Sequence, residues 1–257
     1  MTALEETAFE RRSVPAGVVL SIGLAWAASI AAYATGGTRL LDHDAVVGTG
    51  TVALGSLLAF GAAWTVMVTA MMLPSALPLV RLYAATASRQ PRPGVALAAF
   101  SSGYLALWVA FGWLALSFDT TVHRTVDGWP WLAAHPSLVT AAVLVLAGAF
   151  QFSSLKDRCL DTCRHPAAYL LAHYRRGTSA AFRLGWGHGL FCLGCCWALM
   201  LVAFATGMTD LRLMAAFTGL MAYEKIGRHG DTVARLAGIA LLVLGAIAAL
   251  EVLSYPR

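Results

Sequence analysis

The cysteines of this chain fall in two short clusters whose composition indicates soft-metal binding or thiol redox chemistry. The first cluster is Cys159-x3-Cys163 and the second is Cys192-x2-Cys195-Cys196, and together they hold all five cysteines of the sequence. Thiolates bind soft metal ions and also form and exchange disulfides. Such a concentration of thiols in an otherwise apolar chain is the main clue to its chemistry.

Helical spacing groups these residues further. Residues three and four apart share one face of a helix, so His188 joins the second cluster in a single stripe, and Cys159 and Cys163 form a similar pair. Five thiols and an imidazole suit Cu(I) best, because soft ligands select it. Zn(II) accepts three or four such ligands, and an iron–sulfur cluster needs four thiolates, so both stay open as alternatives.

Two methionines and one carboxylate are further candidate ligands. Met71 and Met72 lie just before Pro74, at the end of a predicted span, where Pro74 and Pro78 free backbone carbonyls. Glu224 falls near the same predicted level, where it binds a metal, accepts a proton or pairs with a basic residue. Packing is the alternative for the sulfur residues, since Cys is readily buried and Met fills irregular gaps.

Composition predicts an all-α, polytopic transmembrane helical bundle that forms a single membrane domain over residues 1–257. The sequence is 59% hydrophobic and only 12% charged, with a mean hydropathy of +0.70. Several apolar runs reach the length of about 20 residues that a membrane helix needs. We predict seven spans, or six if the short sixth segment does not cross. They cover residues 15–35, 50–73, 95–117, 137–155, 185–206, 209–225 and 234–253.

Basic residues predict the orientation of the bundle in a bacterial inner membrane. Arginine and lysine gather in segments 80–94, 156–184 and 226–235, whereas segments 36–49 and 118–136 are mixed or acidic. Positive charge marks cytoplasmic loops, so the N-terminus is expected inside and both thiol clusters near the cytoplasmic mouth. The same rule explains the sequence pI of about 9.1 without nucleic-acid binding.

The largest predicted non-membrane piece is the basic, cysteine-containing segment 156–184. Pro166 interrupts it, and Ala167 to Arg176 is predicted as a short amphipathic helix on the inner leaflet. Arg175 and Arg176 would then lie near the phosphates of membrane lipid. A solvated basic loop explains the same charges.

Four blocks of this sequence resemble a bacterial family described as predicted metal-binding integral membrane proteins. They are Ala70–Ser75 (AMMLPS), Leu155 to Pro166, Gly189–Met200 (GLFCLGCCWALM) and Glu224-Lys225, within about residues 60 to 230. The resemblance implies a metal site among Met71, Met72, Pro74, Cys159, Cys163, Cys192, Cys195, Cys196 and Glu224.

These observations favour a membrane protein that binds Cu(I) near the cytoplasmic mouth for transport or delivery, with a small metal-carrying protein as a possible partner. The sequence contains no G-x4-G-K-[ST] loop, so movement of the ion would be passive, ion-coupled or partner-driven. The first alternative is a membrane thiol–disulfide oxidoreductase with Cys192 and Cys195 as active pair and Cys159 and Cys163 as relay. The second is a structural or assembly subunit of a membrane complex. A non-enzymatic role is favoured, and no oligomeric state is indicated.

Overall fold

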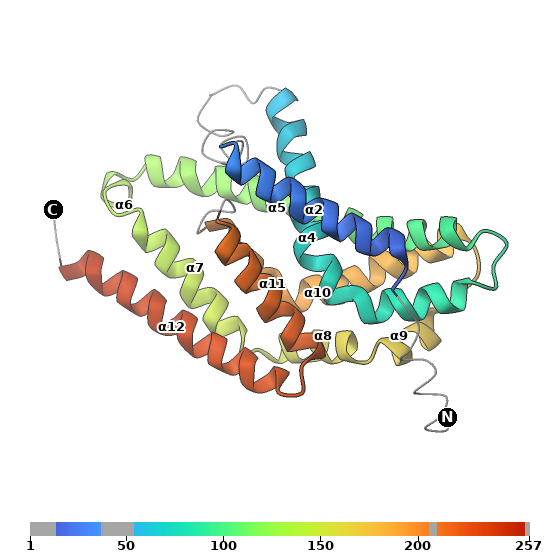
Figure 1. Cartoon of the computed structure of the whole chain (residues 1–257). Helices are drawn as coiled ribbons and strands as arrows, with labels where there is room; N and C mark the ends of the chain where they lie inside the picture. Colours follow the sequence, from blue (N-terminus) through green and yellow to red (C-terminus); the bar gives the residue numbers. More distant parts are fainter. Residues whose placement is uncertain (1–13, 37–53, 206–209, 255–257) are drawn as a thin grey trace.

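Helices make up the whole of the regular structure in the computed structural model, which describes residues 14–36, 54–205 and 210–254 (Figure 1). The helices are α2 (Ala16–Ala34), α4 (Leu54–Ala87), α5 (Pro93–Asp127), α6 (Pro130–Ala133), α7 (Ser137–Phe150), α8 (Ser154–Arg164), α9 (Pro166–His173), α10 (Thr178–Ala205), α11 (Leu211–Ile226) and α12 (Gly230–Ser254). Within the described residues there is no strand. The predicted all-α bundle is confirmed.

The candidate membrane spans among the described residues number five or up to six, which agrees with the six-span alternative of the sequence prediction rather than with seven. In the described part of the chain, five helices are long and apolar enough to cross a membrane: α2, α4, α5, α10 and α12. A sixth span results if α7 and α8, which meet at a bend of 63°, cross together. The predicted sixth segment forms α11, which has 16 residues. That length gives only about 24 Å of helix, short of the roughly 30 Å of a bilayer core.

The second span is longer than predicted, because α4 continues through both of its prolines to Ala87. Pro74 has no N–H, so the carbonyl of Ala70 lacks its usual helical donor. The indole Nε1 of Trp26 in α2 donates to that carbonyl at 3.1 Å. A neighbouring helix thus satisfies the group that the proline frees, and the helix bends without ending (Figure 1).

Helix α10 is the centre of the bundle. It packs most extensively against α5 and also contacts α8, α7 and α11, whereas α12 packs along α7 at one side (Figure 1). Glycines allow the close approach of α5 and α10. A Cβ atom added to Gly185 would collide with the carbonyl oxygen of Phe100, and one added to Gly103 would collide with that of Phe182. Small residues of this kind are how membrane helices bring their backbones together.

Local capping explains how α8 and α9 begin. Ser153 precedes α8, and its hydroxyl accepts a hydrogen bond from the backbone N–H of Lys156 at 3.2 Å. Pro166 is the first residue of α9, where its missing N–H costs nothing. Gly177, with φ of 104°, then makes the turn into α10, a conformation that suits only glycine.

The predicted basic segment 156–184 forms α8, α9 and the start of α10. Its predicted amphipathic helix is α9, which ends at His173 rather than Arg176, and Tyr169 and Leu170 are buried. Arg175 and Arg176 follow the helix and are exposed. The predicted cytoplasmic N-terminus, residues 1–13, and most of the predicted outer segment 36–49 lie outside the described residues.

The contact between α5 and α10 provides the first prediction. Gly185→Ala places a methyl group against the backbone of Phe100, which has no room to move away. We expect the free energy of unfolding in detergent to fall by about 1 to 3 kcal/mol, as for other overpacked sites. Gly23→Ala in α2 is the matched control, since a Cβ there meets nothing within 4 Å. Equal unfolding midpoints for the two variants would contradict the close contact.

Candidate metal site

Both thiol clusters lie inside the bundle around α10, and all five cysteines are buried and unpaired in disulfides. The predicted stripe of His188, Cys192, Cys195 and Cys196 is present on α10, and every member is buried. The three thiols lie close to one another, since Cys195 is near both Cys192 and Cys196. Each of them also contacts a neighbouring helix.

Cys195 faces α8, where it meets the first cluster. Its sulfur lies near that of Cys163 and also near those of Cys192 and Cys196 on its own helix. Cys159 lies one helical turn earlier on α8, and a Cβ atom added to Gly194 would stand 2.5 Å from its sulfur. The absence of a side chain at Gly194 therefore lets α8 bring both of its thiols against α10. The two clusters, 29 or more residues apart in the chain, meet at this contact.

Cys196 faces α4 and meets a thioether. Its Sγ lies 4.0 Å from Sδ of Met72 and donates a hydrogen bond to the carbonyl oxygen of Cys192 at 2.8 Å. Of the two predicted thioether ligands, Met72 is therefore the one beside a thiol, while Met71 is buried in the apolar core. Cys196 and Met72 form a second soft pair that joins two helices.

Cys192 faces hydrogen-bonding groups and a positive charge. The hydroxyl of Tyr104 in α5 lies 2.9 Å from its Sγ, and Nζ of Lys225 in α11 donates to the same sulfur at 2.9 Å. Lys225 also donates to Oγ of Ser75 at 2.9 Å. The Tyr104 hydroxyl further donates to the carbonyl oxygen of Met72 at 3.1 Å. Cys192 is thus held in a polar network that already contains a cation.

His188 lies between two tyrosines next to the thiols. Its ring centroid is 5.9 Å from that of Tyr104 and 5.5 Å from that of Tyr169. The imidazole is buried, and Nδ1 has no hydrogen-bond partner among the described residues. Leaving a buried nitrogen unpaired costs about 1 to 3 kcal/mol, so a free lone pair here is available to a ligand that enters the cluster.

Glu224 is not an interfacial residue but half of a buried ion pair. Its Oε2 lies 2.7 Å from Nζ of Lys156, and the two side chains are 2% and 0% exposed. Its other oxygen, Oε1, has no hydrogen-bond partner in the described part of the chain. Arg164 of α8 donates to the backbone carbonyl of Glu224 at 2.9 and 2.7 Å and forms an outer ion pair with Asp231 at 2.6 Å. These contacts fasten α8 to α11.

Tyr169 connects α9 to this cluster. Its hydroxyl donates to the carbonyl oxygen of Leu184 at 3.1 Å, and a Cβ atom added to Gly187 would stand 2.7 Å from that hydroxyl. Burial, with a smaller contribution from Cys163, raises the pKa of Tyr169 to about 12. The phenol therefore stays neutral and acts as a hydrogen-bond donor at physiological pH.

Sequence reasoning missed the partners that surround the thiols: Lys156, Lys225, Tyr104 and Tyr169. A charged residue inside a membrane helix almost always has a partner within the protein, so Leu155-Lys156 and Glu224-Lys225 carried a signal for the two lysines. The tyrosines carried none, because a tyrosine in an apolar helix is ordinary.

The arrangement provides soft pairs rather than a closed metal cage. In the part of the chain that the structure describes, no group of three or more His, Cys, Asp or Glu side chains is placed to hold a metal ion. Cys163 with Cys195, and Cys196 with Met72, are sulfur pairs that bridge helices, and Cys195 also lies near Cys192 and Cys196. Such pairs are able to bind a soft ion of low coordination number or, for the two thiols, to form a disulfide.

Comparison with known families shows to which family the chain belongs. The family model PpoB2, described as a copper chaperone, matches residues 61–248. The chain belongs to this family. The PpoB2 match includes every residue of the buried thiol cluster and all four blocks on which the sequence resemblance rests. No curated protein and no solved structure matches the chain.

The buried ion pair provides the second prediction. Lys156→Met leaves the Glu224 carboxylate buried without its partner, which should lower the free energy of unfolding by about 3 to 5 kcal/mol. The double variant Lys156→Met/Glu224→Leu removes both charges and should recover most of that loss. Unfolding in detergent, followed by circular dichroism, measures both.

The matched control is Asp231→Asn, which breaks the outer ion pair with Arg164. That carboxylate is 71% exposed, so its loss should cost less than about 1 kcal/mol. If Lys156→Met costs no more than Asp231→Asn, the Lys156–Glu224 pair does not fasten α8 to α11 as the geometry indicates.

Proposed function

We propose that this protein binds Cu(I) between the sulfurs of Cys163 and Cys195 and delivers it to a partner protein. The observation that carries the proposal is the proximity of these two thiols, one from α8 and one from α10, inside a buried group of sulfurs that also includes Cys192 and Cys196. Membership of a family described as copper chaperones supports copper as the cargo. Thiolates are the ligands that Cu(I) prefers.

The ligand geometry favours Cu(I) over the alternatives. A zinc site needs three or four protein ligands, and an iron–sulfur cluster needs four thiolates. No such group occurs among the described residues. Cu(I) is stable with few soft ligands. A pair of thiols with a thioether and an imidazole nearby therefore suits Cu(I) as the structure stands.

The same reasoning separates Cys192 from the primary ligands. Nζ of Lys225 lies 2.9 Å from its sulfur, so a cation bound at Cys192 would be repelled at short range in a medium of low dielectric constant. We assign Cys192 to the hydrogen-bonded network that positions α10 and α11. Cys196 and Met72 remain as a second soft pair through which the ion is exchanged.

Release of the ion requires α8 to move. Cys163 and Cys195 are 8% and 1% exposed, so a partner reaches them only when α8 separates from α10. α8 follows a bend of 63° after α7 and is attached to α11 through Lys156 and Arg164. Because α8 is short and lies between the bend and this attachment, it is suited to such a movement. The opened state would allow ligand exchange with a small metal-carrying protein.

The remaining candidates take supporting roles in this proposal. Met72 and His188 act as auxiliary donors during exchange, and Cys159 packs α8 against Gly194. Glu224 supplies the countercharge of Lys156. The basic segments that surround α8 and α9 favour the cytoplasmic side of a bacterial inner membrane for this end of the bundle, with the N-terminus on the same side.

The third prediction tests the ligand pair. Protein purified reduced and without oxygen is titrated with Cu(I) against a chromophoric chelator. Even changes outside the ligand shell of a metal site cost about 10- to 100-fold in affinity, so Cys163→Ser or Cys195→Ser should cost about 100-fold or more. Cys192→Ser is the matched control on the same helix as Cys195; it changes a group outside the ligand pair, so it should cost about tenfold, clearly less than either ligand change.

Two results would contradict the proposal. One is wild-type protein that binds no Cu(I) in the titration. The other is a Cys192→Ser variant that loses as much affinity as Cys163→Ser. If the wild type instead binds no copper and forms a Cys163–Cys195 disulfide that a dithiol reduces and quinone re-forms by oxidation, the protein is a thiol–disulfide oxidoreductase.

A further inference from the structure

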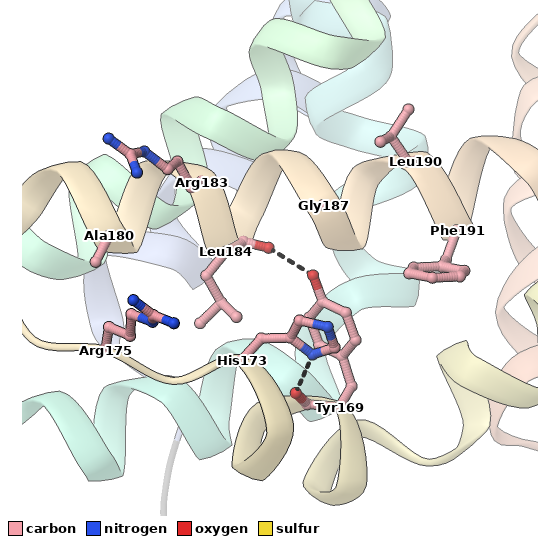
Figure 2. A pocket seen from close by; sticks show the side chains of 9 residues that line it. All are labelled: Tyr169, His173, Arg175, Ala180, Arg183, Leu184, Gly187, Leu190 and Phe191. Atoms are coloured by element: carbon pink, nitrogen blue, oxygen red, sulfur yellow. Dashed lines mark hydrogen bonds between the residues drawn. The ribbon is translucent and has the colours of Figure 1, made fainter.

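A pocket between α9 and α10 lies directly beside the thiol cluster. Its volume is about 330 Å³, within the range of small-ligand sites, and Tyr169 forms part of its wall. Figure 2 shows Arg175 and Leu184 projecting into the space between the two helices, above His173 and Tyr169, with Phe191 at one end. The pocket therefore opens at the surface, and its wall includes Tyr169, which also borders the thiols.

The lining of this pocket selects an anionic ligand. It combines Arg175, Arg183 and His173 with apolar side chains, and none of the residues that line it is acidic. Both arginines are exposed and form no ion pair with the residues that the structure describes, so their donors are available to carboxylate groups. A second pocket of similar size, lined by Asp157, Asp231 and Arg235, has the opposite charge balance.

Tyr169 joins the pocket to the proposed copper ligands. Its phenol lines the pocket, interacts electrostatically with Cys163 and lies 5.5 Å, between ring centroids, from His188. Among the described residues, the hydroxyl donates its hydrogen bond to the carbonyl oxygen of Leu184 (Figure 2). Movement of one aromatic side chain would therefore connect a ligand in the pocket with the thiols.

We propose that this pocket binds a small anionic thiol that carries Cu(I), with Arg175 and Arg183 holding its carboxylates while copper passes to Cys163. The inference rests on the proposed function, since it names the source of the copper. In the transfer, the bond from copper to the carrier sulfur breaks as the bond to Cys163 forms. The proton of the Cys163 thiol goes to the departing carrier thiolate, and copper stays Cu(I) throughout.

The test compares two sources of Cu(I) with the full-length protein in neutral detergent. One source is Cu(I) bound to glutathione, a tripeptide thiol with two carboxylates, and the other is Cu(I) in acetonitrile, a neutral ligand. Transfer is followed by stopped-flow absorbance of the copper–thiolate band. Arg175→Gln/Arg183→Gln should slow transfer from glutathione about tenfold, because electrostatic steering is lost, and leave transfer from acetonitrile unchanged.

Arg176→Gln/Arg235→Gln is the control, since it removes the same charge outside this pocket and should leave both rates unchanged. Equal rates from glutathione for the wild type and for Arg175→Gln/Arg183→Gln overturn the inference. A slowing that is accompanied by loss of a co-purified anionic phospholipid also overturns it, because the pocket is then a lipid site. If the wild type takes up no copper from acetonitrile either, the proposed function itself fails, and the two failures are thereby distinguished.

Discussion

The structure depends on the ion pair between Lys156 and Glu224, which are 2.7 Å apart and almost fully buried. A charge inside a membrane bundle is costly unless it is paired, so this pair fixes α8 against α11. Arg164 strengthens the same junction through the backbone of Glu224. Because Cys163 lies on α8, the junction also decides where the first thiol cluster meets the second. The contact between Cys163 and Cys195 therefore depends on the ion pair between Lys156 and Glu224.

Next to that junction, the three thiols of α10 contact residues of neighbouring helices. Cys195 meets α8, Cys196 meets Met72 of α4, and Cys192 meets Lys225 of α11. Glycines allow this close packing, since the absence of a side chain at Gly185 and Gly194 lets α5 and α8 approach the α10 backbone. All of these sulfurs lie in the part of the chain that matches a family described as a copper chaperone.

The sequence predicted the helical bundle and the helical spacing of the thiols, because composition and period alone determine them. It did not predict that α4 continues past Pro74, since the carbonyl of Ala70 is satisfied by Trp26, far away in the sequence. It offered pairing with a basic residue as one role of Glu224 but did not name Lys156 as the partner, and it did not predict that Cys192 contacts a lysine. These facts depend on which helices touch, and a single sequence does not encode that in its local pattern.

X-ray absorption at the copper edge of the Cu(I)-loaded protein tests the central claim most directly. The account predicts a low-coordinate Cu(I) bound by a pair of sulfurs, with a spectrum that changes in Cys163→Ser and is preserved in Cys192→Ser. A site dominated by nitrogen or oxygen ligands, or a spectrum that Cys163→Ser leaves intact, would contradict it.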